Sequence, residues 1–189
     1  ITIEKRSIDL MKEQLKEAIM QTIASWDEAD IYVVSLYVYD DNDDPCRPTV
    51  TVGYNTESYL NEQIEYASDE EEARWNYAFW LQNEEFAFGK DDTADIVRQW
   101  IIDSGFAYCQ ACDTTPVEYE SEITKAFVEL LVEIVRELHN SGFIKETFGR
   151  EIPVLIHELE YYYEIGEQNI RANGVELAGE FAEFCGYIN

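Results

Sequence analysis

Positive charge is the scarcest feature of this 189-residue sequence. Lysine and arginine total 13 against 40 aspartates and glutamates, which sets the formal net charge at −27. Phosphate backbones and anionic membranes are bound through clusters of basic residues, so this composition argues against a nucleic-acid or membrane partner. Acidic surfaces attract cationic proteins and speed their encounter, although the same charge also serves solubility alone.

Long hydrophobic runs and cysteine-rich patterns are absent as well. No segment approaches the roughly 18 uncharged apolar residues that a membrane-spanning helix needs. Residues 1–17 lack the basic and apolar regions of a signal peptide. The four cysteines are scattered over a chain too long to need disulfide staples. We therefore expect a cytoplasmic protein whose thiols are reduced.

Complete catalytic motifs are also absent, because the chain has no G-x-S-x-G, Walker or G-x-G-x-x-G sequence. Two motifs are partial. Cys109 and Cys112 form one C-x-x-C, which alone does not decide between metal binding, redox chemistry and the favoured reading of ordinary thiols. His157 and Glu158 begin the zinc-protease sequence H-E-x-x-H, but Tyr161 replaces its second histidine. We expect no catalytic residue, no metal site and no cofactor.

The acidic segment 40–48 resembles the start of a calcium loop. Asp40, Asn42 and Asp44 match its first three ligand positions. The glycine and glutamate that fix the geometry of such a loop are replaced here by Pro45 and Thr51. A solvated hairpin loop is therefore the favoured interpretation.

Hydrophobic periodicity predicts both helices and strands in this chain. Residues 31–39 are rich in β-branched and aromatic residues, and residues 49–54 return as a second strand, which predicts a central hairpin. A further short strand is expected at residues 85–88. Amphipathic or capped segments predict helices at residues 6–26, from Thr56 onward, 68–82, 93–103, 115–141 and 175–184.

Two of these elements bear on the core. The helix at residues 115–141 carries one apolar stripe, which we expect to pack on the sheet: Ile123, Phe127, Leu130, Leu131, Ile134 and Leu138. Residues 152–157 are either a strand that leads into a helix at 158–172, or part of one longer helix that begins at Pro153. Residues 1–189 are thus expected to form a single acidic α+β domain, in which helices cover a small, at least partly antiparallel sheet.

Several short segments occur in a distinctive order, namely residues 30–37, 53–57, 73–75 with Trp80, 148–149, 152–161 and Asn173. Their order resembles an uncharacterised bacterial family of small acidic α+β proteins, a numbered domain of unknown function. The resemblance covers nearly the whole chain and implies a bacterial cytoplasmic protein, and it supplies no catalytic residues. Immunity proteins of contact-dependent toxin systems are similar in size and charge, by analogy alone.

Two functional hypotheses follow. The first is a non-catalytic protein that binds a basic protein partner, for example an immunity or antitoxin-like protein. Its candidate binding residues form two acidic clusters: Asp40, Asp41, Asp43 and Asp44, and Asp69, Glu70, Glu71 and Glu72. The second cluster has a competing explanation, because acidic residues in the first turn of a helix favour the helix dipole. The alternative function is a metal- or His/Glu-dependent enzyme that uses His157 and Glu158.

Overall fold

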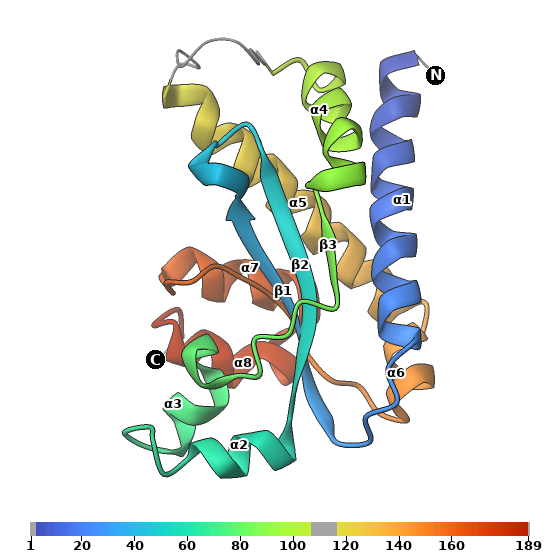
Figure 1. The fold of residues 1–189 in the computed structure, drawn as a ribbon. Coiled ribbons are helices and arrows are strands. Elements are labelled where there is room, and N and C mark those ends of the chain that lie inside the picture. The colour runs from blue at the N-terminus through green and yellow to red at the C-terminus, as the bar shows by residue number, and fades with distance from the viewer. Residues whose placement is uncertain (1–2, 107–116, 189) are drawn as a thin grey trace.

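The computed structural model describes residues 3–106 and 117–188, with side chains described for residues 9–106 and 122–188. Helices and a small sheet make up an α+β fold, as the sequence predicts (Figure 1). The helices are α1 (Ile3–Ala24), α2 (Glu57–Gln63), α3 (Glu70–Trp75), α4 (Ala94–Asp103), α5 (Val117–Asn140), α6 (Phe143–Phe148), α7 (Tyr163–Asn173) and α8 (Val175–Phe184). Short 3-10 turns form η1 (Asp41–Asp43), η2 (Tyr77–Phe79) and η3 (Asp91–Thr93).

The sheet has four strands in the order β3-β2-β1-β4. Its two central strands are β1 (Ile31–Asp40) and β2 (Pro48–Thr56), which pair antiparallel, so the predicted central hairpin is confirmed. At one edge β3 (Phe86–Phe88) pairs antiparallel with β2. At the other edge β4 (Val154–His157) pairs parallel with β1, which decides between the two alternatives for residues 152–157 in favour of the strand.

One face of the sheet is covered by α1, α4 and α5. Because side chains alternate along a strand, Val34, Leu36 and Val38 of β1 all point to this face and are buried there. Helix α5 lies behind the strands in Figure 1, and its apolar stripe packs on the sheet as predicted. Leu130 is the exception within the stripe, because it lies at the margin of the core and is only partly buried. Its neighbour Leu131 is fully buried.

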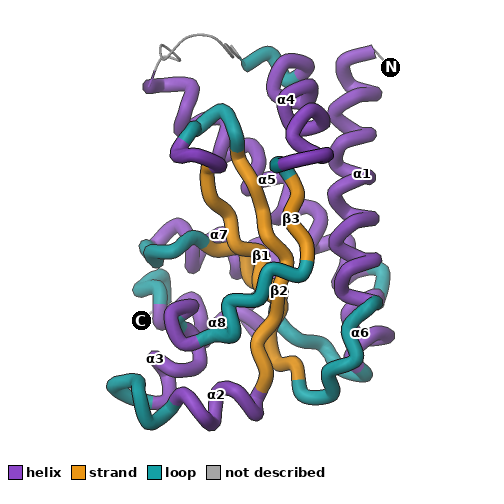
Figure 2. The backbone as a smooth tube through the Cα atoms, in the orientation of Figure 1, coloured by secondary structure: helices purple, strands orange, loops and turns teal. Residues whose placement is uncertain are grey.

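The second face is covered by α3, α7, α8 and the segment that follows α3. That segment crosses in front of β1 and β2 before it enters β3 (Figure 2). Gly53 of β2 permits the close approach, because a β-carbon there would collide with the main chain of Asn83. The Asn83 side chain also accepts a hydrogen bond from the Tyr54 amide at 2.9 Å. The hydrophobic core on this face, here called the second core, is therefore formed by a loop as well as by helices.

The predicted helix at residues 68–82 is wrong in extent. Helix α3 ends at Trp75, Asn76 is extended, and η2 follows as a separate turn. Trp75, Tyr77 and Trp80 are all buried in the second core. In a continuous α-helix, positions two apart lie about 200° apart around the axis, so Trp75 and Tyr77 would face opposite sides. The break lets all three aromatic side chains reach the same core.

Helix α7 closes the free edge of β4 with amide side chains. Asn169 accepts a hydrogen bond from the Ile156 amide at 2.8 Å and donates to the Ile156 carbonyl at 2.7 Å. Asn173, one turn later, makes the same pair of bonds with Val154 at 2.8 and 2.9 Å. Gln168 adds a further donor to the Ile156 carbonyl. The edge strand is thus satisfied by a helix, which begins five residues later than the predicted helix at 158–172.

Candidate functional site

The predicted acidic loop at residues 40–44 is partly neutralised by the chain itself. Arg47 lies 3.2 Å from the carboxylate of Asp44 and 3.7 Å from that of Asp41. Asp44 also accepts a hydrogen bond from the Cys46 amide at 3.0 Å. Asp43 is exposed at the tip, and Asp40 lies 3.5 Å from the Thr124 hydroxyl of α5. The loop is an ordered turn at the end of the hairpin and not an extended, fully charged tip.

The second predicted cluster serves mainly to begin a helix. Asp69 is the N-cap of α3 and accepts the Glu72 amide, while Glu72 accepts the Ser68 amide at 2.7 Å. That bond holds the pKa of the Glu72 carboxyl below its ordinary value. The N-cap is therefore Asp69, whereas the capping-box spacing in the sequence predicted Ser68. The exposed Glu70 and Glu71 line a shallow depression with Glu180 of α8.

The structure does not bring the two predicted clusters together. The hairpin turn that carries Asp40, Asp41, Asp43 and Asp44 is at the top of Figure 1, whereas the start of α3 is at the bottom. The strands of the hairpin run between these ends. The two clusters therefore lie at opposite ends of the hairpin, and each is considered separately.

His157 is fully buried in a box of aromatic rings at the end of β4. Its ring lies 4.8 to 5.8 Å, centroid to centroid, from the rings of Tyr37, Tyr77, Trp80 and Tyr161. Its Nε2 is 2.8 Å from the Ser35 hydroxyl, and its Nδ1 is 3.1 Å from the Glu158 carbonyl oxygen. A carbonyl only accepts, so Nδ1 carries the proton and Ser35 donates to Nε2.

This geometry bears on the enzyme alternative. Burial lowers the pKa of His157 from 6.5 to about 4, which keeps the imidazole neutral near pH 7. The Glu158 carboxylate accepts a hydrogen bond from the Tyr162 hydroxyl, so it is engaged on the surface rather than with the imidazole. Ser35 and His157 have the spacing of a nucleophile and its base, but both are buried. The pair fits a satisfied polar contact within the core.

A groove lies beside this box on the surface, and sequence reasoning missed it. We call it the α5–α7 groove; it has a volume of about 740 Å³ and lies between α5, α7 and the segment that joins β4 to α7. It is lined by Thr124, Lys125, Val128, Glu129, Glu158, Tyr162, Glu164, Glu167, Gln168 and Arg171. Strands β1 and β4 are parallel, so both end on this side of the molecule, and Thr124 links the groove to Asp40 of the hairpin.

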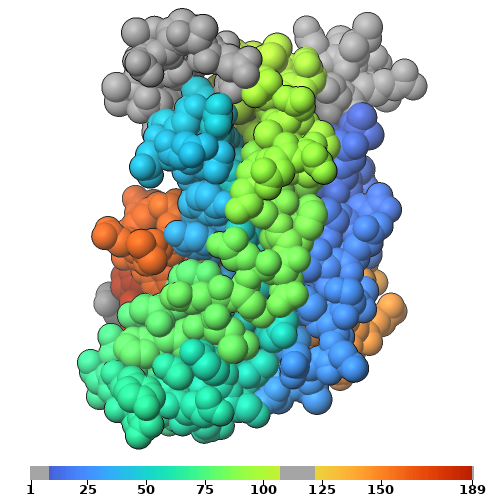
Figure 3. Space-filling model, in the orientation of Figure 1, coloured from blue at the N-terminus to red at the C-terminus, as the bar shows by residue number. Residues whose placement is uncertain are grey.

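Figure 3 shows the edge of this region in the orientation of Figure 1. The hairpin turn, in blue, lies above the orange segment near residues 158–164 at the left edge, and the outline is hollowed between them. Leu159 and Tyr163 are large exposed side chains of this segment, at 66% and 55% exposure. Large exposed apolar side chains that lie close together are typical of surfaces that bind protein partners.

Comparison with protein-family models, curated proteins and solved structures gives no match. The resemblance drawn from the short motifs thus remains a prediction. Within the residues that the structure describes, no helix is long and apolar enough to cross a membrane, and no group of three or more His, Cys, Asp or Glu side chains is arranged to hold a metal ion. Cys46 and Cys185 form no disulfide within the described part of the chain, while Cys109 and Cys112 lie outside the described residues.

The carboxylates of the groove are unequal in their pairing. Arg171 makes a bidentate contact with Glu129 at 2.6 and 2.7 Å, which lowers the pKa of Glu129 and neutralises its charge. Three glutamates make no described ion pair, namely Glu158, Glu164 and Glu167, although Glu167 lies within electrostatic reach of Arg171. The sequence carries the signal for this site in the run of glutamates and tyrosines at 158–164, but His157, just before the run, is buried and Tyr161 within it is partly buried.

Proposed function

We propose that this protein binds a cationic protein partner, in the manner of an immunity or antitoxin-like protein of the cytoplasm. The observation that carries the proposal is that the chain has already used most of its own positive charge. Among the side chains that the structure describes, eight cations make ion pairs with carboxylates of the same chain: Lys12, Lys16, Arg47, Arg74, Lys90, Arg98, Lys125 and Arg171. Most of the 40 acidic residues are therefore left for solvent or a partner.

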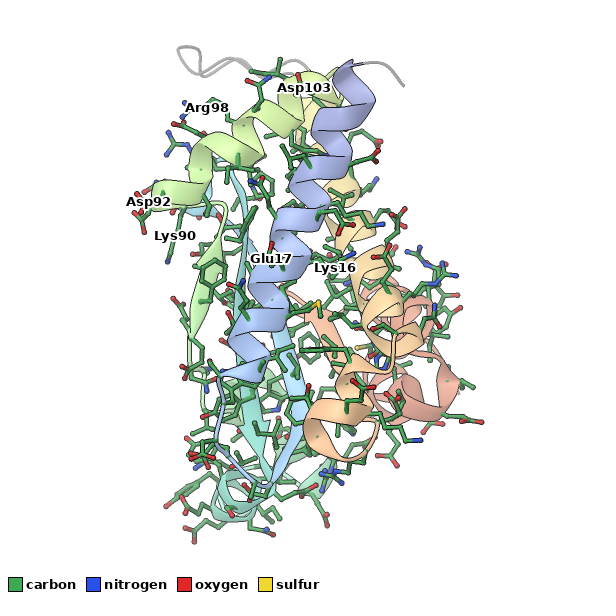
Figure 4. The ribbon with its side chains drawn as sticks, turned by 90° about the vertical axis from the view of Figure 1, so that its right-hand side faces the viewer. Lys16, Glu17, Lys90, Asp92, Arg98 and Asp103 are labelled. Atoms are coloured by element: carbon green, nitrogen blue, oxygen red, sulfur yellow. The ribbon has the colours of Figure 1, made fainter. Side chains whose placement is uncertain are left out.

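Two sides of the molecule differ in their surface features. On the face of Figure 4 cations stand among acids: Lys16 beside Glu17 on α1, and Lys90 and Arg98 near Asp92 around the start of α4. The groove side also carries cations, Lys125 and Arg171, but it combines its glutamates with a hollow and exposed aromatic side chains. Charge on a rim steers a cationic partner toward this side, and the hollow supplies the area that can be desolvated.

The proposal is tested by capturing partners from a lysate of the source cell and measuring their charge. The immobilised protein should retain proteins of high isoelectric point, which elute as salt rises because exposed charges are screened. A matched column carries a variant in which Glu158, Glu164 and Glu167 are changed to glutamine; it should retain less of the same proteins. Retention of mainly neutral or acidic proteins, insensitive to salt, would contradict the proposed function.

A further inference from the structure

We propose that the α5–α7 groove receives an arginine side chain of the partner, with its guanidinium stacked on the ring of Tyr162 and paired with Glu158. This inference rests on the proposed function and names the chemistry that the groove recognises. It is carried by the arrangement of one exposed tyrosine, its bonded carboxylate and the apolar floor between two helices.

Tyr162 is held in place while its ring stays accessible. Its hydroxyl donates to Glu158 at 2.9 Å, and its side chain is 43% exposed. Burial, followed by the nearby charge of Glu158, raises the pKa of the Tyr162 phenol, so the phenol stays neutral at physiological pH. A cation over the face of a tyrosine ring is attracted by the ring quadrupole, and the attached carboxylate adds a charge-assisted hydrogen bond.

The rest of the groove supplies charge and an apolar surface. Glu164 and Glu167 stand on the first turns of α7 and make no described ion pair. The two cations that line the groove, Arg171 and Lys125, are paired with Glu129 and Glu122, and Arg171 also interacts electrostatically with Glu167. Val128 of α5 and the buried Gln168 of α7 also line the hollow. The methylene groups of a long cationic side chain can lie against such a floor while its head reaches the carboxylates.

Arginine fits this site better than lysine for physical reasons. A guanidinium is planar and more weakly hydrated than an ammonium group, so it stacks on an aromatic face and pairs bidentately with a carboxylate. The chain makes such a bidentate pair itself, between Arg171 and Glu129 on the wall of the groove. The inference therefore predicts a preference between two side chains of equal charge, which a general electrostatic attraction does not produce.

The first experiment compares two synthetic peptides, one with arginines spaced by glycine and serine and one with lysines at the same positions. Their affinities for the protein are measured by NMR titration. The arginine peptide should bind at least about three-fold more tightly than the lysine peptide. Its binding should shift the amide resonances of Val128, Tyr162 and Gln168. Equal affinity, or shifts confined to other surfaces, would overturn the inference.

Substitutions then test whether Tyr162 causes the preference for the arginine peptide over the lysine peptide. Tyr162→Leu should abolish this preference, and Tyr162→Phe should keep most of it because the ring remains. Tyr163→Leu is the matched control, since Tyr163 is the exposed neighbour whose ring packs on Tyr187 at 4.8 Å and does not line the groove. A thermal melt of each variant checks folding, and the phenylalanine variant keeps the test decisive if the leucine variant is unstable. A preference that survives Tyr162→Leu in a folded protein would overturn the inference.

A pair of charge variants separates the groove from the overall field. Glu158, Glu164 and Glu167 are changed together to glutamine, and the control changes Glu70, Glu71 and Glu180 at the α3–α8 depression. Each variant removes three negative charges. The groove variant should weaken the arginine peptide about ten-fold and the control less than about three-fold at low salt. Equal losses would leave the proposed function standing but overturn the groove as its site, whereas a lack of binding by basic proteins and peptides alike would overturn both.

Discussion

Asn169→Ala tests how the groove is held against the sheet. Asn169 is fully buried, and its amide group joins α7 to the free edge of β4 through the amide and the carbonyl of Ile156. Alanine keeps the helix propensity high, so the change removes these bonds without a penalty on the helix itself. Because α7 also carries Glu164 and Glu167, a loss at this edge should be felt at the groove.

The magnitude follows from the partners that remain. The Ile156 carbonyl keeps the donor from Gln168 at 2.9 Å, so its loss is that of one ordinary hydrogen bond, about 0.5–1.5 kcal/mol. The Ile156 amide has no other described partner and would be buried unsatisfied, which costs about 1–3 kcal/mol. We expect Asn169→Ala to lower the free energy of unfolding by about 2–4 kcal/mol in total.

Asn173→Ala is the comparison, because Asn173 makes the same two bonds with Val154 but is only partly buried; its Oδ1 also lies 3.0 Å from His139 Nε2. Water can replace its amide, so we expect a loss of about 1 kcal/mol. Urea denaturation measures both values, and hydrogen exchange should show the Ile156 amide opening faster in Asn169→Ala. A loss below about 0.5 kcal/mol for Asn169→Ala, or equal losses for the two variants, would refute the reasoning.

Two further predictions concern the two faces of the sheet. Leu131→Ala should cost about 2–5 kcal/mol in denaturant melts, and the partly buried Leu130→Ala less than half as much; the reverse order would show that α5 is turned differently. The pKa of His157, about 4 in the fold against 6.5 when exposed, means that the unfolded chain gains a proton first as pH falls. The contribution of this pKa difference to the free energy of unfolding should therefore be complete above about pH 6.5 and decrease as pH falls toward 4. The decrease should be on the order of 3 kcal/mol, and it should be absent in His157→Gln. An NMR titration in which His157 titrates near its ordinary value would disprove this.

The sequence predicts this fold well wherever one periodicity runs through an element. The alternation and β-branched residues of β1, and the single stripe of α5, are local features that specify type and buried face together. The helix predicted at residues 68–82 fails because its aromatic residues satisfy a long-range contact: Tyr77 and Trp80 pack on His157, which is far away in sequence. That the chain forms one domain stays a prediction.

The candidate site was less predictable for a related reason. Acidic runs such as 40–44 and 69–72 are visible in the sequence, but their use in capping and in pairing with Arg47 depends on the fold. The groove is lined by residues of α5 and by residues of α7 some forty positions later in the sequence, and no local sequence pattern predicts that they lie together. Within the run of three tyrosines, Tyr161 is partly buried beside His157 and Tyr162 is exposed. This difference depends on the path of the chain after β4.

The central claim, that this protein binds a cationic partner through its acidic surface, is tested most directly by the salt dependence of association. The association rate constant of a purified captured partner is measured by surface plasmon resonance at about 50 mM and about 500 mM NaCl, where the screening length differs about three-fold. We predict a fall of about ten-fold or more between these conditions, and a smaller fall for the triple glutamine variant at Glu158, Glu164 and Glu167. An association rate that is unchanged by salt in the wild-type protein would contradict the account.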